Sequence, residues 1–222
     1  MRAPIDVAIE ATATKVFATA VDWPGWSRPG RTEALALDAL ASYVERYATV
    51  AREVGLSVGE PGLLEFEVVE RAPGGSGTEF GVPSRVTDHD RRSTSGPEAE
   101  RLAALVDAAW RTFDRIAGHA PAELRKGPRG GGRDTAKIVG HVVGADHAYA
   151  REIGIRLRPP SPDDRQALEA MRAAMLDVIR QPSDGSPLAD RKWPTRYAAS
   201  RIAWHALDHA WEIEDRSEPG PR

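Results

Sequence analysis

The sequence predicts an α+β protein: an N-terminal unit of strand–strand–helix–strand order, followed by an all-α four-helix bundle. Three observations support this division. The first third of the chain has short stretches rich in β-branched residues around one helical stretch. A segment dense in Gly, Ser and Pro follows. Beyond it, apolar residues recur at helical spacing in four long stretches that prolines separate.

The N-terminal unit is delimited by turn signals. Asp22-Trp23-Pro24-Gly25 ends the second strand, and a further turn is expected over residues 28–31. Thr32 is a suitable N-cap for the helix, and Gly55 ends it. We expect one helix packed on an antiparallel sheet. The expected elements are strand 7–13, strand 16–21, helix 33–54 and strand 63–71.

The stretch VFATAVDWPGWSRPGRTEALALDALASYVERY carries a strand, a D-x-P-G turn, a short Gly-Thr turn and an Ala/Leu-rich helix. It resembles the HicB-like domain, and the resemblance covers about the first 70 residues. It implies a HicB-like α+β domain over residues 1–72. The matching positions are Asp22, Pro24, Gly25, Gly30, Thr32 and the helix from Glu33.

Residues 73–96 are rich in Gly, Ser, Pro and charge, and a linker is expected there. Within it, His89 lies between Asp88 and Asp90. Such a cluster can bind a metal ion, but we favour a solvated loop.

The second half has the apolar period of helices. Trp110 and Phe113 lie on one apolar stripe of the first helix, which Pro97 begins and Gly118 ends. Four amphipathic helices of this length are typical of a four-helix bundle, expected over residues 97–217 with a tail at 218–222. The helices are expected at 98–118, 134–153, 163–180 and 195–216.

Two histidines on the last helix form the strongest functional signal. His205 and His209 are four residues apart, so both imidazoles lie on one helix face and can reach one ion. Ala198, Ile202 and Ile213 share that side, which predicts that the pair faces the bundle interior. Neutral histidines in an apolar setting need polar partners, and a shared metal ion meets that need.

The second helix of the bundle supplies the third expected ligand. His141 is flanked by Ile138 and Val142, which predicts an inward position. His147 lies about 240° further around the helix, so we expect it to be exposed or to lie behind the ligands. His205 is followed by Ala206 and not by Glu, so the H-E-x-x-H arrangement of metallopeptidases is missing.

This pattern resembles the DinB-like superfamily of metal-binding four-helix bundles. One histidine lies in IVGHVVGADH and an H-x-x-x-H pair in RIAWHALDHAWEIEDR, which places His141, His205 and His209 as the metal ligands. The resemblance implies a divalent metal site. It also implies a reaction of the thiol-dependent S-transferase or isomerase type, with bacillithiol, mycothiol or glutathione as cosubstrate.

Three neutral imidazoles leave an ion its full charge and an open position for water or a thiol. Zinc or nickel is the expected metal, and iron also suits the ligands. Glu212 and Asp208 are the candidate catalytic groups beside the triad, and Glu212 can be a fourth metal ligand, a base or an acceptor that orients a ligand. A plain charged helix end explains Glu212 equally well.

Composition narrows the function classes. The 30 basic and 33 acidic side chains give a net charge of −3, so neither nucleic acid nor a membrane surface is an expected partner. With no cysteine, no protein thiol competes for the metal. The start of the chain has no signal pattern, so we expect a soluble cytoplasmic protein acting on a small-molecule substrate. The exposed sheet edge favours a homodimer.

Three functional hypotheses stay open at this point. The first is a metal-dependent enzyme that transfers a low-molecular-weight thiol or catalyses a related isomerisation. The second is a non-catalytic binding or regulatory protein in which a structural metal stiffens the bundle. The third is a metal-dependent hydrolase that uses metal-bound water.

Overall fold

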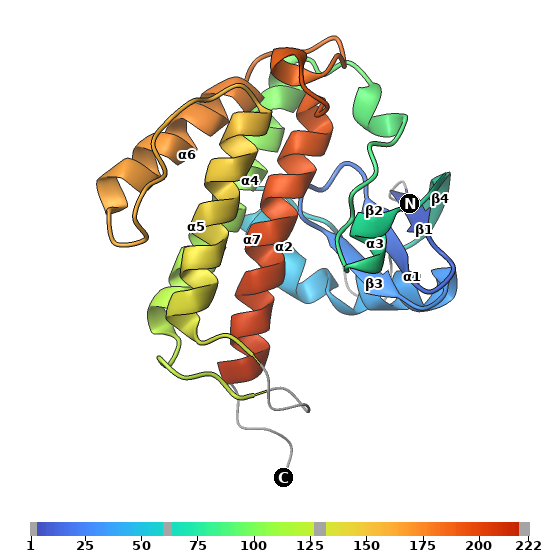
Figure 1. The fold of residues 1–222 in the computed structure, drawn as a ribbon. Coiled ribbons are helices and arrows are strands. Elements are labelled where there is room, and N and C mark those ends of the chain that lie inside the picture. The colour runs from blue at the N-terminus through green and yellow to red at the C-terminus, as the bar shows by residue number, and fades with distance from the viewer. Residues whose placement is uncertain (1–3, 60–63, 127–131, 218–222) are drawn as a thin grey trace.

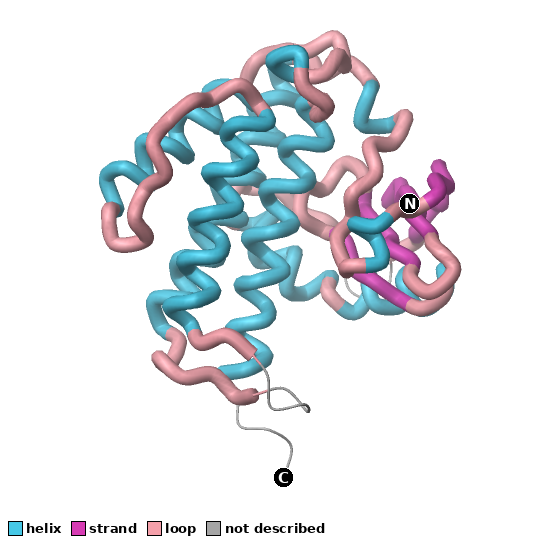
Figure 2. Tube along the Cα trace, in the orientation of Figure 1, coloured by secondary structure: helices cyan, strands magenta, loops and turns pink. Residues whose placement is uncertain are grey.

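The computed structural model describes residues 4–59, 64–126 and 132–217. Within these ranges the chain is an α+β protein with one four-stranded sheet and seven α-helices. Figure 2 shows the strands gathered on one side of the molecule and the long helices on the other. None of the helices in the described ranges combines the length and the apolar character that crossing a bilayer requires.

The sheet has the strand order β3-β2-β1-β4. The antiparallel strands are β1 (Ile5–Ala11), β2 (Val16–Ala20) and β3 (Ser27–Gly30), and β4 (Phe66–Pro73) runs parallel to β1. The sheet is therefore mixed, and the prediction of a purely antiparallel sheet was wrong. A parallel neighbour needs a crossover, which the helices between β3 and β4 supply.

Strand β3 lies where only a turn was expected. Its Pro29 pairs with Phe17 at the edge of the sheet, where a residue without an N–H is tolerated. The N-terminal order is therefore β-β-β-α-α-β and not β-β-α-β.

The expected helix 33–54 is two helices, α1 (Glu33–Ser42) and α2 (Val44–Arg52). The break is at Tyr43, whose φ of −95° and ψ of 3° leave the helical region. Its ring packs against Trp211 with centroids 5.0 Å apart, and the Arg28 guanidinium lies 3.9 Å above it. A side-chain contact with a distant helix thus outweighs local helix propensity at this residue.

The D-x-P-G turn is held between α2 and α7 (Thr195–Ser217). Tyr47 donates its hydroxyl to the Pro24 carbonyl at 2.8 Å, from a position stacked on Trp26. Gly25 has a φ of +92°, and a Cβ there would lie 2.8 Å from the Leu207 side chain. Glycine is therefore required both by the backbone conformation and by the close approach to α7.

The segment 73–96 differs from the expected linker. It contains α3 (Ser76–Glu79) and the short 3₁₀ turn His89–Arg91, and several of its side chains are buried. The buried carboxylate of Glu10 accepts the backbone N–H groups of Ser84 and Arg85 at 2.9 and 3.0 Å. This segment is therefore packed against the sheet.

Four long helices follow, close to the predicted bounds: α4 (Gly96–His119), α5 (Thr135–Glu152), α6 (Arg165–Ile179) and α7. Helix α7 packs against both α4 and α5, and α5 runs beside it in the opposite direction (Figure 1). The sheet lies on another side of α7, where Phe17 meets Trp204 edge to face. The buried apolar residues of the sheet unit and the helical region form one continuous core.

Candidate metal centre

The three predicted histidines lie together between two neighbouring helices. His141 comes from α5, and His205 and His209 come from α7. One ring nitrogen from each lies within 4.8 Å of the others, and the ring centroids are 4.7 to 5.0 Å apart. Among the described residues, this is the cluster of His and acidic side chains with the spacing of a metal site.

The triad lies at the edge of the helical region and not in its interior. His205 is buried and His209 is half-buried, but His141 is exposed, contrary to the predicted inward position. Helix α5 turns Ile138 and Val142 toward the core, and His141 lies about 100° away from Val142 around the axis. Its ring therefore reaches α7 from the side, which leaves the cluster accessible to small molecules.

The nitrogen geometry fits a bound ion. Nε2 of His205 lies 3.2 Å from Nε2 of His141, and Nδ1 of His205 is buried without a hydrogen-bond partner in the described part of the chain. Zinc bound tetrahedrally at 2.0–2.1 Å from each nitrogen places its ligand atoms about 3.3 Å apart. Imidazole nitrogens that converge from three side chains are a donor set that such an ion uses.

The protonation states also suit metal binding. Burial lowers the pKa of His205 to about 2, with the nearby positive charges of His209 and Arg201 adding to the effect. Burial also lowers the pKa of His141. Both rings are therefore neutral at pH 7, which is the form that ligates a metal.

Glu212 orients one of the three rings. Its carboxylate accepts a hydrogen bond from Nδ1 of His209 at 2.8 Å, which leaves Nε2 of that ring for an ion. Its other oxygen accepts from Arg216 at 2.8 Å. The hydrogen bond to His209, more than the Arg216 charge, lowers the pKa of Glu212 and keeps it ionised.

The other predicted residues lie outside the triad. Asp208 turns toward the sheet, where it accepts a hydrogen bond from Arg28 of β3 at 3.0 Å. Burial raises the pKa of Asp208, and the Arg28 charge opposes that rise. His147 is half-buried and its Nε2 lies 2.9 Å from the Leu157 carbonyl oxygen.

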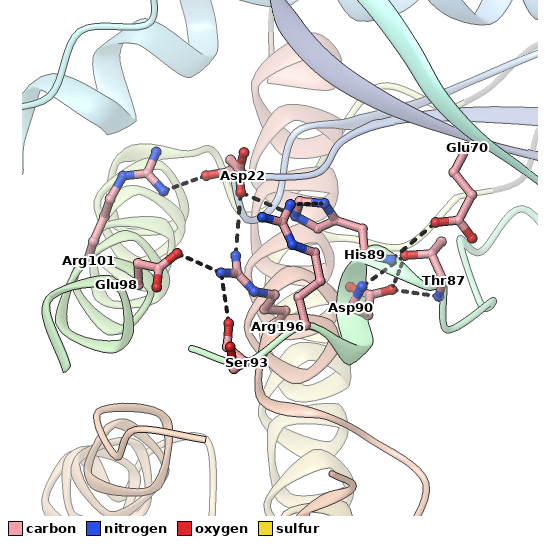
Figure 3. Close-up of polar contacts among 10 residues, drawn as sticks. Asp22, Glu70, Thr87, His89, Asp90, Ser93, Glu98, Arg101 and Arg196 are labelled. Atoms are coloured by element: carbon pink, nitrogen blue, oxygen red, sulfur yellow. Dashed lines mark hydrogen bonds and ion pairs between the residues drawn. The ribbon is translucent and has the colours of Figure 1, made fainter. Parts of the chain in front are cut away.

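A cluster of charged side chains around His89 was not predicted, because His89 was expected in a solvated loop. His89 is buried, with Nε2 3.2 Å from the Asp22 carboxylate and Nδ1 3.3 Å from the Arg92 guanidinium. Arg196 of α7 also reaches Asp22 at 3.4 Å and Glu98 of α4 at 2.7 Å. Figure 3 shows Asp22, His89, Glu98 and Arg196 pointing toward one another where the turn, the segment 87–93 and the two helices meet.

We call the group of Asp22, His89, Glu98 and Arg196 the polar junction. It could not be found from the sequence because its members are far apart in the chain. Asp22 was visible only as part of a turn motif, and Arg196 as one helix arginine among many. The hydrogen bond to His89, more than the Arg196 charge, lowers the pKa of Asp22. Nε of Arg196 has no hydrogen-bond partner in the described ranges, but both nitrogens of His89 and the other two nitrogens of the Arg196 guanidinium have partners within the chain. This geometry is that of a structural contact.

The chain matches no family model, and no curated protein or solved structure has significant similarity to it.

Proposed function

We propose that this chain is a divalent-metal-binding protein in which His141, His205 and His209 hold the ion. In this proposal, α4 to α7 act as a DinB-like four-helix bundle, with the HicB-like N-terminal unit packed on α7. The observation that carries the proposal is the convergence of three imidazoles from two helices, with Nε2 of His205 lying 3.2 Å from Nε2 of His141. Zinc or nickel suits this donor set best, and iron is also compatible.

The proposed reaction is transfer of a low-molecular-weight thiol to a small electrophile, or a related isomerisation, in the cytoplasm. An ion on three neutral imidazoles supplies a Lewis acid with an open position, which lowers the pKa of a bound thiol. The exposure of His141 supports access by a cosubstrate. The chain itself has no cysteine that would occupy the ion instead.

The surroundings of Glu212 favour this reaction over hydrolysis. A metal-dependent hydrolase needs a base beside the metal-bound water. Glu212 is the nearest acidic group to the triad in the last helix, and both of its oxygens are engaged by His209 and Arg216. Asp208 is paired with Arg28. Glu212 is therefore better suited to fix the His209 ring than to accept a proton from water.

Metal content tests the first half of the proposal. Elemental analysis of the purified protein is expected to give one ion per chain, and His205→Ala is expected to lose it. His119→Ala is the matched control, because His119 is exposed on α4 and its Nδ1 lies 2.7 Å from the Arg115 carbonyl oxygen. Wild-type protein without metal, or full retention of metal in His205→Ala, would contradict the proposal.

Thermal shift measurements test the reaction class. The zinc-, nickel- or iron-loaded protein is mixed with bacillithiol, mycothiol or glutathione. We expect one of these thiols to stabilise the loaded wild type and not the chelator-treated protein. If the ion binds but no thiol changes the melting temperature, the regulatory alternative with a structural metal is favoured.

A further inference from the structure

A cavity of about 30 Å³ lies between the sheet, the segment 83–90 and the first half of α7. Two arginines, Arg85 and Arg201, line it together with the hydroxyl-bearing side chains of Tyr197 and Ser200. Arg201 comes one helical turn before His205, and the Tyr149 ring of α5 lies beside both, with its centre 5.3 Å from the Arg201 guanidinium and 5.6 Å from the centre of the His205 ring. Arg201 therefore lies between the cavity and the histidine triad.

Neither arginine has an ion-pair partner within 4.0 Å among the described residues. Nη1 of Arg201 is also buried without a hydrogen-bond acceptor in that part of the chain. Its guanidinium lies 4.7 Å from the ring centre of Trp204 and 5.3 Å from that of Tyr149. These aromatic contacts stabilise the cation but do not supply the acceptor that Nη1 lacks.

The two acids in the cavity wall are already engaged elsewhere. The Glu10 carboxylate accepts the backbone N–H groups of Ser84 and Arg85. The Asp90 carboxylate accepts both the N–H and the hydroxyl of Thr87 at 2.8 Å, as Figure 3 shows. Burial also raises the pKa of Asp90, and the hydrogen bonds from Thr87 oppose that rise. Two guanidinium groups therefore face the cavity without a free counter-ion.

We infer that this cavity binds a carboxylate, with Arg201 and Arg85 as its cationic partners. The donor set of guanidinium and hydroxyl groups recognises oxyanions. A volume of 30 Å³ holds about two water-sized groups, which matches a carboxylate better than the larger phosphate. Because Arg85 is exposed, a ligand can enter past its side chain.

The position of the cavity also indicates a substrate class. Arg201 and His205 are about 6 Å apart along the axis of α7. A small molecule held by its carboxylate at Arg201 can therefore extend its other end toward the triad. This step rests on the proposed metal function, and it assigns small carboxylate-bearing molecules as the substrates or thiols of the site.

The carboxylate site is tested without metal, by calorimetric titration of chelator-treated protein with succinate, succinamide and inorganic phosphate. We expect succinate to bind, Arg201→Gln and Arg85→Gln to weaken it at least tenfold, and succinamide not to bind. Arg151→Gln is the matched control, because Arg151 is an exposed arginine on the neighbouring α5. Urea unfolding of each variant checks that the fold is kept.

Three results would overturn the carboxylate assignment. They are no succinate binding to the wild type, equal weakening by Arg151→Gln, and tighter binding of phosphate than of succinate. His205→Ala separates this site from the metal site, because it is expected to lose the ion and still bind succinate.

The connection to the triad is tested with the metal-loaded protein and two ligands of similar size, 3-mercaptopropionate and butyrate. A tenfold preference for the thiol, lost in both Arg201→Gln and His205→Ala, is expected. Equal affinities would refute the substrate class while leaving the separate metal-content test unaffected.

Discussion

Helix α7 carries two histidine-containing clusters that differ in how their polar groups are satisfied. At the polar junction, both nitrogens of His89 have partners, and Arg196 connects Asp22 with Glu98. In the triad, two imidazole nitrogens face each other and Nδ1 of His205 has no partner in the described ranges. Buried groups that are satisfied within the chain hold a fold together, and groups that are not are suited to bind something from outside.

The largest effect on stability is expected from a substitution in the polar junction. Arg196→Met removes the buried guanidinium that joins Asp22 to Glu98, and because water screens these two half-exposed carboxylates we expect a loss of about 2 kcal/mol in unfolding free energy. Arg165→Met is the control, because Arg165 is exposed and pairs with Glu169 on its own helix. Urea denaturation of chelator-treated protein measures both. A loss below 1 kcal/mol for Arg196→Met would contradict a structural role.

A smaller effect is expected at the triad, on metal affinity. Glu212→Gln weakens the acceptor that holds the His209 ring, and such changes typically lower metal affinity about 10- to 100-fold. Asp208→Asn is the matched control, because Asp208 is paired with Arg28 and should leave the affinity unchanged. Competition with a chromophoric chelator gives both values. Equal weakening in the two variants would show that general charge, not ring orientation, is responsible.

The smallest effect is a pH dependence that separates the clusters. The folded-state pKa of His205 is about 2, below its ordinary 6.5. The unfolded chain therefore takes up the proton first, and metal-free stability is full above pH 6.5 and falls as the pH drops below it. For Glu98, whose pKa is lowered from 4.5 to about 2, chiefly by hydrogen bonds from Ser95, the loss begins only below pH 4.5.

Urea unfolding in the presence of chelator gives the free energy of unfolding of the wild type and of His205→Phe at pH 7.5 and 5.5. The quantity compared is the difference between the two proteins at each pH. Between pH 7.5 and 5.5, the unfolding free energy of the wild type should fall by about 1.4 kcal/mol more than that of the variant. A difference is needed because burial raises the pKa of Asp146 to about 6, which stabilises both proteins as the pH falls. An unchanged difference between the two pH values would mean that His205 is not shielded from water.

The parts of the fold that follow from local pattern were predictable. The apolar period and the proline breaks gave the four long helices within a few residues, and the four-residue spacing of His205 and His209 placed them on one face. His141 was chosen because Ile138 and Val142 flank it, and although the expected inward position was wrong, its ring lies beside those of His205 and His209. Whether the cluster binds metal stays a prediction.

The parts that depend on distant partners were not predictable. Strand β3 forms because β2 offers it an edge, and the helix breaks at Tyr43 because its ring meets Trp211. The burial of His89 depends on Asp22, 67 residues away. The exposure of His141 depends on how α5 is rotated about its own axis, which the apolar pattern defines only to within one residue position.

The close contact at Gly25 has a consequence for modularity. Helix α7 turns Ala203 and Leu207 toward the D-x-P-G turn, and it turns His205 and His209 toward α5. Residues two positions apart on α7 thus pack against two different parts of the molecule. The histidine face therefore cannot be transferred to another scaffold without substituting residues on the opposite face of α7. The same holds if the sheet unit is exchanged for an unrelated one.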